Sequence, residues 1–150
     1  MAYYICPNCH DRIIDADGRQ GLSHQAVGCE RCGFGFVFEL LDDYYPRPES
    51  AMVACDHEGR VIAAGRGTFE LTGYRELDLI GRPAASVLGL HGFAEGHDPV
   101  GTAREWGVRQ LDEAAYIRHA AGRDKRVVLD VFPELNGEGG LLLVLAPRSA

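Results

Sequence analysis

The sequence contains little that points to nucleic acid or to a membrane. Its 15 Lys and Arg are outnumbered by 22 Asp and Glu, which gives a formal net charge of −7 over 150 residues. Because phosphate backbones are bound by clustered Lys and Arg, this balance disfavours a nucleic-acid partner. The longest apolar run, Leu141–Ala146, falls far short of the roughly 18 residues that a membrane-spanning helix needs. We therefore expect a globular protein with no membrane span.

Catalytic motifs and targeting signals are also missing. The sequence contains no phosphate-binding G-x-x-x-x-G-K-[ST] loop, no H-E-x-x-H motif and no recognisable pair of nucleophile and base. We therefore do not expect an enzyme. The first residues, Met1–Ile5, lack the charged and apolar regions of a secretory signal, so a cytoplasmic location is expected.

Four of the five cysteines stand in two C-x-x-C pairs. Cys6 and Cys9 form the first pair, Cys29 and Cys32 form the second, and nineteen residues lie between the pairs. Thiolates are soft ligands, and two such pairs can close a tetrahedral shell around a single zinc ion. The spacing therefore predicts a zinc ribbon with bound Zn2+ in a structural role, since no coordination position stays open for catalysis.

Two other uses of these cysteines are less consistent with the sequence. Cys6–His10 also spells C-x-x-C-H, the c-type haem attachment pattern, but that chemistry would leave the second pair without a role. Two disulfides would need an oxidising compartment, which the N-terminal sequence does not indicate.

A short proline-containing spacer, Tyr45–Ser50, divides the chain. We predict a zinc ribbon over residues 1–46 and a second domain over residues 50–147. A unit of about 45 residues has little core of its own, so zinc would supply the missing stability, on the order of 10 kcal/mol. Tyr3–Ile5 leads into the first cysteine pair and Arg12–Ile14 leads out of it, and a strand is expected at residues 34–40.

The second domain alternates short strands with a helical middle section. Ala51–Cys55 and Arg60–Ala64 are apolar strands that flank the turn Asp56–Gly59, which predicts a hairpin. Short helical pieces are expected from Gly67 to Leu90, because glycine and proline interrupt that stretch repeatedly. The expected breaks are at Gly73, Gly81-Arg82-Pro83 and Gly89.

A longer helix is predicted from Asp98 to Gln110. Asp98 can cap its N-terminus, and Pro99 suits its first turn. Val100, Ala103 and Trp106 recur on one side, so we expect Trp106 to fill the core. The final strands are predicted at residues 114–120, 126–132 and 140–146, with Asn136-Gly137 in the last turn.

This order of elements, together with its residues, resembles the PAS family over about residues 50–147. Asp56–Ala64 looks like the family's D-x-x-G-x-I-x-x-x-N, Phe69–Tyr74 like F-x-x-L-T-G-Y, and Leu77–Pro83 like E-L-I-G-[RK]-P. One departure is Gly65, where the family usually has an Asn that braces the turn. The resemblance implies an α+β fold: a five-stranded antiparallel sheet with helices on one face, here preceded by the small β zinc ribbon.

The resemblance also raises the question of a cofactor. Light-sensing members use a Cys that attacks flavin, and Ala84 stands at the matching position, which argues against that photochemistry. Haem-bearing members use an imidazole near a His-Asp pair, and His97-Asp98 and His91 lie in roughly that place. The remaining alternatives are an unidentified small ligand under Trp106 and a packed core without any ligand. The fifth cysteine, Cys55, is expected to be a small buried hydrophobe.

We therefore expect a signalling or regulatory module that acts through protein–protein contacts, in transcriptional or two-component control. A haem- or small-ligand-binding sensor is the alternative. The first 48 residues contain four basic and seven acidic residues, so the ribbon favours a protein partner or a second copy over nucleic acid. Its aromatic residues exceed what so small a unit can bury, and such a surplus indicates a contact surface. These residues are Tyr3, Tyr4, Phe34, Phe36 and Phe38.

Overall fold

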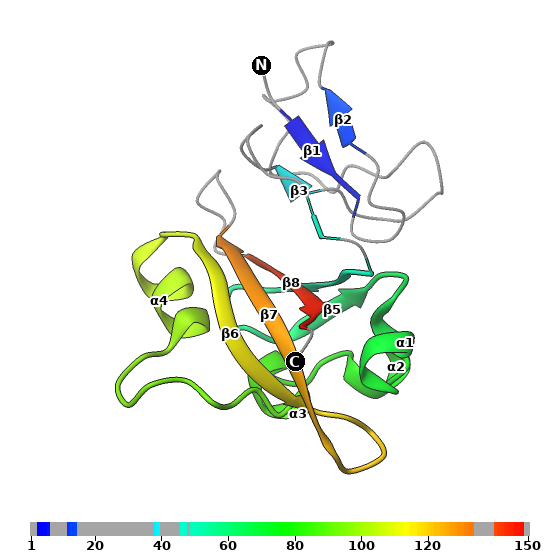
Figure 1. Cartoon of the computed structure of the whole chain (residues 1–150). Coiled ribbons are helices and arrows are strands. Elements are labelled where there is room, and N and C mark those ends of the chain that lie inside the picture. The colour runs from blue at the N-terminus through cyan, green and yellow to red at the C-terminus, as the bar shows by residue number, and fades with distance from the viewer. Residues whose placement is uncertain are drawn as a thin grey trace.

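The computed structural model describes residues 3–6, 12–14, 38–39, 46–47, 49–133 and 140–148. Its N-terminal part contains a three-stranded antiparallel sheet in the order β2-β1-β3 (Figure 1). The strands are β1 (Tyr3–Ile5), β2 (Arg12–Ile14) and β3 (Phe38–Glu39). The first two lie in the segments that lead into and out of the first cysteine pair. The third covers two residues of the predicted strand 34–40, and residues 34–37 lie outside the described ranges.

The second sheet has five antiparallel strands in the order β5-β4-β8-β7-β6. They are β4 (Ala51–Cys55), β5 (Val61–Ala64), β6 (Gln110–Arg118), β7 (Asp124–Pro133) and β8 (Leu141–Pro147). The β4–β5 hairpin is confirmed: Asp56 Oδ1 accepts the N–H groups of Glu58 and Arg60 at 2.9 and 3.0 Å, and closes the turn. The predicted Asn136-Gly137 turn lies outside the described residues.

Four helices lie between β5 and β6 in the sequence. They are α1 (Thr68–Thr72), α2 (Glu76–Leu79), α3 (Ala84–Val87) and α4 (Pro99–Trp106). Gly73 ends α1 with a φ of 77°, a conformation that glycine adopts without steric strain. The predicted breaks near residues 73, 81–83 and 89 are therefore confirmed. Within the described residues, no helix has the length and apolarity of a membrane span.

The helices pack against one face of the five-stranded sheet, which we call the inner face (Figure 1). Alternate residues of the strands point to this face and form the main core with apolar residues of the helices. From the strands the core takes Val53, Cys55, Leu129, Val131, Leu143 and Leu145, and from the helices it takes Leu71, Leu79, Ala84 and Ala103.

The opposite face of the sheet, which we call the outer face, is also buried. Its residues are Met52 and Ala54 of β4, Asp130 and Phe132 of β7, and Leu142, Val144 and Ala146 of β8, each exposed by 3% or less. None of these belongs to the core cluster beneath the helices. Figure 1 shows the N-terminal strands on this side of the sheet. The sheet is therefore a central layer that is covered on both faces.

The predicted long helix is too long, and one of its core residues was assigned wrongly. Asp98 caps α4 by accepting the Gly101 N–H at 3.1 Å, as predicted, but the helix ends at Trp106 instead of Gln110. Gly107 stops it with a φ of 67°. Trp106 is 76% exposed and does not fill the core. Each residue turns a helix by about 100°, so Trp106 lies about 120° away from Val100.

Strand β6 begins four residues before the predicted Ala114. The pairing between β6 and β7 shifts register between Gln110 and Glu113, where a β-bulge accommodates the extra residue. Asp112 lies in this bulge with a φ of 59°, an uncommon conformation for a residue other than glycine. The first half of β6 is polar, and the bulge interrupts the alternation of its side chains. The start of the strand was therefore not recognised from the sequence.

Candidate functional site

The predicted zinc ligands fall mostly outside the described residues. Cys6 directly follows β1 and is buried. Cys9, Cys29 and Cys32 lie in the ranges that the structure does not describe, so the four-cysteine site stays a prediction. Burial of Cys6 suits a structural thiolate ligand, since such ligands are shielded from water by the unit that they hold together.

The inner core contains the position at which a light-sensing relative would carry its reactive cysteine. Ala84 occupies that position as the first residue of α3 and is buried against the sheet. A methyl group has no sulfur that could attack a flavin. The prediction that this chain lacks cysteine–flavin photochemistry rests on the identity of this buried residue, which is alanine.

The two histidines considered as haem ligands make contacts at the edge of the domain. His97 Nε2 lies 2.7 Å from Glu113 Oε2, and its ring packs edge-on against Phe93. His91 stacks on Tyr116, and its Nδ1 lies 2.7 Å from the Gly89 carbonyl oxygen. Both side chains are about two-fifths exposed, at 41% and 42%. Haem ligation by either residue stays a prediction, and it would require the imidazole to leave these partners.

His91 also contributes to a small charged cluster with β6 and β7. Its Nε2 lies 3.4 Å from Asp124 Oδ2, and Arg118 Nε donates to Asp124 Oδ1 at 2.9 Å. The hydrogen bond from Arg118, helped by the charges of His91 and Arg118, lowers the pKa of Asp124 below its usual value. Asp124 therefore stays ionised, and the cluster holds the segment before α4 against β6.

A second charged group connects the spacer to the outer face. Asp130 of β7 is 1% exposed and lies among apolar side chains, directly across from Val144. Its Oδ2 accepts from Arg47 Nη1 at 2.9 Å, and its Oδ1 accepts the Asp112 N–H at 2.8 Å. Arg47 also pairs with the Asp112 carboxylate. This Arg47–Asp130–Asp112 group joins the spacer, the β6 bulge and the centre of the sheet.

Sequence reasoning missed this group, although one signal was present. Asp130 interrupts an otherwise apolar stretch of β7, Val127–Phe132. A buried carboxylate in such a position needs a cation or several N–H donors. Its partner was not predictable, since Arg47 lies 83 residues earlier in the chain.

Comparisons with known proteins identify the architecture. No family model matches the chain, and no curated protein matches it. Among solved structures, the PAS domain of a Colwellia psychrerythraea protein aligns with a TM-score of 0.54 at 21% identity, over 67% of this chain and 86% of that one. The PAS domain of the fruit-fly ELK potassium channel gives 0.56 at 15% identity, over 68% and 89%.

A light-sensing relative of the same fold aligns equally well. The LOV domain of the Erythrobacter litoralis EL346 blue-light-activated histidine kinase gives a TM-score of 0.55 at 19% identity, over 69% of this chain and all of that domain. The five-stranded sheet and its helices have a PAS/LOV-like fold. At these identities the likeness establishes the fold alone, and the functions of these domains do not transfer with it. The expected α+β fold class is confirmed for this part of the chain.

The PAS-like core contains a thiol that we expect to be unreactive. Cys55 is buried in β4, and desolvation, together with the nearby charge of Asp56, raises its pKa to about 12. At pH 8 the thiolate fraction is then on the order of 10⁻⁴. In the native protein, iodoacetamide should therefore label Cys55 far more slowly than in urea, as followed by mass spectrometry of the peptide. Comparable rates in both states would show that Cys55 is accessible and would contradict the buried assignment.

Proposed function

We propose that this chain is a regulatory module in which a PAS-like domain acts through a protein partner, with the zinc-stabilised N-terminal segment as the contact. The observation that supports this role is the Arg47–Asp130–Asp112 group. It connects Arg47 of the spacer to a buried carboxylate of the sheet. A shift of β6 or β7 would therefore change the position of the spacer.

The buried outer face limits which surfaces can take part. Because Met52, Leu142 and Val144 are covered within the chain, the outer face is not available for a partner in this state. Contact with a protein partner or with a second copy is therefore assigned to the N-terminal segment itself. We propose a homodimer through that segment as the simplest assembly. We further propose that the protein acts by binding and not by catalysis.

Zinc content tests the first element of this proposal. The intact protein, expressed with sufficient zinc, should contain a single zinc ion per chain by elemental analysis, held by Cys6, Cys9, Cys29 and Cys32. Cys29→Ser should abolish the bound zinc, since three thiolates hold the ion far more weakly than four. Cys55→Ala is the matched control, since it removes a cysteine of β4 and should retain the metal. Absence of zinc from the unmodified protein would contradict the assignment.

Light scattering of the intact chain tests the assembly. A homodimer that dissociates when zinc is chelated would support contact through the N-terminal segment. A monomer at all concentrations would exclude the homodimer. The contact would then be with another protein, which cross-linking in a cell extract can identify, with Cys29→Ser as the comparison.

A further inference from the structure

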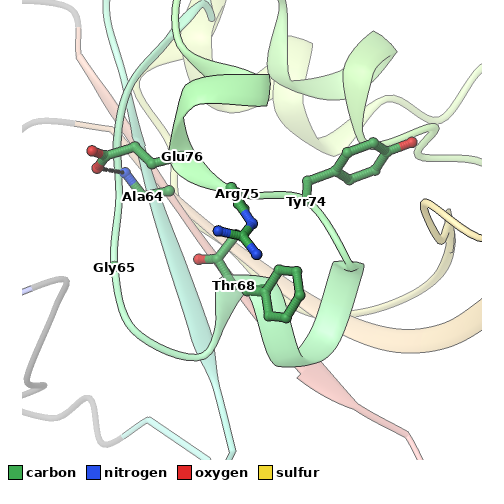
Figure 2. A pocket seen from close by; sticks show the side chains of 7 residues that line it. Ala64, Gly65, Thr68, Tyr74, Arg75 and Glu76 are labelled. Carbon is green, nitrogen blue, oxygen red and sulfur yellow. Dashed lines mark hydrogen bonds between the residues drawn. The ribbon is translucent and has the colours of Figure 1, made fainter.

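A small surface pocket lies where the end of β5 meets the first residues of α1 and the residues around the start of α2 (Figure 2). Its volume is about 360 Å³, near the lower end of the roughly 300–1,000 Å³ that is typical of ligand sites. It opens to solvent. Ala64, Thr68, Phe69, Arg75 and Glu76 contribute to its wall.

Thr68 supplies a buried polar group to this wall. The residue is 2% exposed, and its Oγ1 is the buried side-chain atom that has no hydrogen-bond partner among the described residues. Its backbone is satisfied, since its N–H donates to Gly65 at 3.3 Å and its carbonyl accepts from the Thr72 hydroxyl at 2.7 Å. An unpaired buried hydroxyl lowers stability, whereas a methyl group would occupy the same space without that penalty.

Arg75 supplies a cation to the same pocket. Its guanidinium carbon lies 5.3 Å from the centre of the Phe69 ring, and Arg75 and Thr68 both line the pocket (Figure 2). The nearby carboxylates are already engaged, since Glu76 Oε2 accepts the Ala64 N–H and Asp78 Oδ2 accepts the Arg75 N–H, each at 2.9 Å. Within the described residues no carboxylate pairs with the Arg75 guanidinium, so its donors are available to a ligand.

We propose that this pocket binds a small organic carboxylate with an apolar or aromatic body. The carboxylate accepts hydrogen bonds from the Arg75 guanidinium, whose planar donors match it, and from the Thr68 hydroxyl. The apolar body lies against Phe69, which is half exposed, and Ala64. The Glu76 carboxylate on the same wall disfavours ligands with a second negative charge. This site does not depend on the zinc or on the partner of the proposed function.

Access to the hydroxyl requires side chains of the pocket to move. Thr68 Oγ1 has almost no exposed surface, so a ligand reaches it only when the side chains around it shift. Arg75 is exposed, and exposed side chains change rotamer within nanoseconds. The pocket therefore binds by a local side-chain rearrangement and leaves the sheet unchanged.

Titration of the full chain, followed by amide chemical shifts, tests the proposal. Phenylacetate and hexanoate are the probes, and neutral phenylacetamide is the control ligand. We expect saturable shifts at Ala64, Phe69 and Arg75 with both acids below about 10 mM, and affinity about tenfold lower for the amide. Arg75→Gln and Thr68→Val should each weaken acid binding about tenfold or more. Arg126→Gln, which removes the same charge from β7, should not change it.

Stability provides a second readout for Thr68. Without ligand, Thr68→Val should raise Tm by about 4 °C or more, because it removes an unpaired buried hydroxyl. In the same variant, stabilisation by phenylacetate should disappear. A lower Tm would mean that the hydroxyl is already satisfied and would overturn the proposal. Failure of both acids to bind, or binding that survives both substitutions, would overturn it as well.

Discussion

A fragment that begins at Glu49 is expected to lose most of the stability of the PAS-like domain. Removing the first 48 residues removes Arg47 and the N-terminal strands that Figure 1 shows on the outer face. Four buried side chains would then be exposed to solvent: Met52, Phe132, Leu142 and Val144. Burial of such side chains contributes about 1.5–3 kcal/mol each, so their exposure rivals the total stability of a typical domain, about 5–15 kcal/mol.

Urea unfolding followed by circular dichroism measures this effect. We expect the fragment to unfold at much lower urea than the full chain, or to aggregate through the exposed face. Substituting Met52 and Val144 by Thr in the fragment should restore solubility without restoring stability. A fragment as stable as the intact chain would show that the outer face needs no cover, and that the two parts fold independently.

Arg47→Ala is expected to lower the free energy of unfolding by about 3 kcal/mol. The substitution removes the Arg47 guanidinium from the buried Asp130 carboxylate, and breaking a buried ion pair costs about 3–5 kcal/mol. The lower end of that range applies for two reasons. The Arg47 side chain is 36% exposed, and Asp130 keeps its bond to the Asp112 N–H.

Chemical denaturation of matched variants checks this expectation. Arg126→Ala removes an exposed arginine from the same strand as Asp130 and should change stability by less than about 0.5 kcal/mol. The double variant Arg47→Leu with Asp130→Leu should recover much of the loss, because an apolar pair avoids the desolvation of both charges. If Arg47→Ala proves neutral, the ion pair does not hold the spacer, and the coupling that we propose through it fails.

The elements that the sequence predicted well are those fixed by local chemistry. Asp56 and Gly59 close the β4–β5 turn through short-range hydrogen bonds, so the hairpin is visible from residues 51–64 alone. Gly73 and Gly107 end helices by adopting positive φ, which few other residues do. The first of these breaks was predicted, and the second was not, since the helix was predicted to continue to Gln110.

The errors arise where distant parts of the chain decide the outcome. At the β6 bulge the Asp112 N–H donates to Asp130 on the neighbouring strand, and residues 110–113 alone do not predict that partner. The burial of both sheet faces could have been inferred, since β8 reads Leu-Leu-Leu-Val-Leu-Ala without alternation. Such a run is typical of a strand covered on both sides. The zinc ligands Cys9, Cys29 and Cys32 lie outside the described residues and stay predicted from spacing alone.

Each edge strand of the five-stranded sheet is partly covered by the chain itself. On β5, the Val61 N–H and carbonyl bond to Arg82 and Gly81 at 2.9 and 2.8 Å. On β6, Tyr116 exchanges backbone hydrogen bonds with His91 at 2.8 and 3.0 Å. Open strand edges recruit further strands, as in amyloid growth or peptide β-addition. At these positions the backbone has no groups left to offer to an added strand, which opposes edge-to-edge polymerisation there.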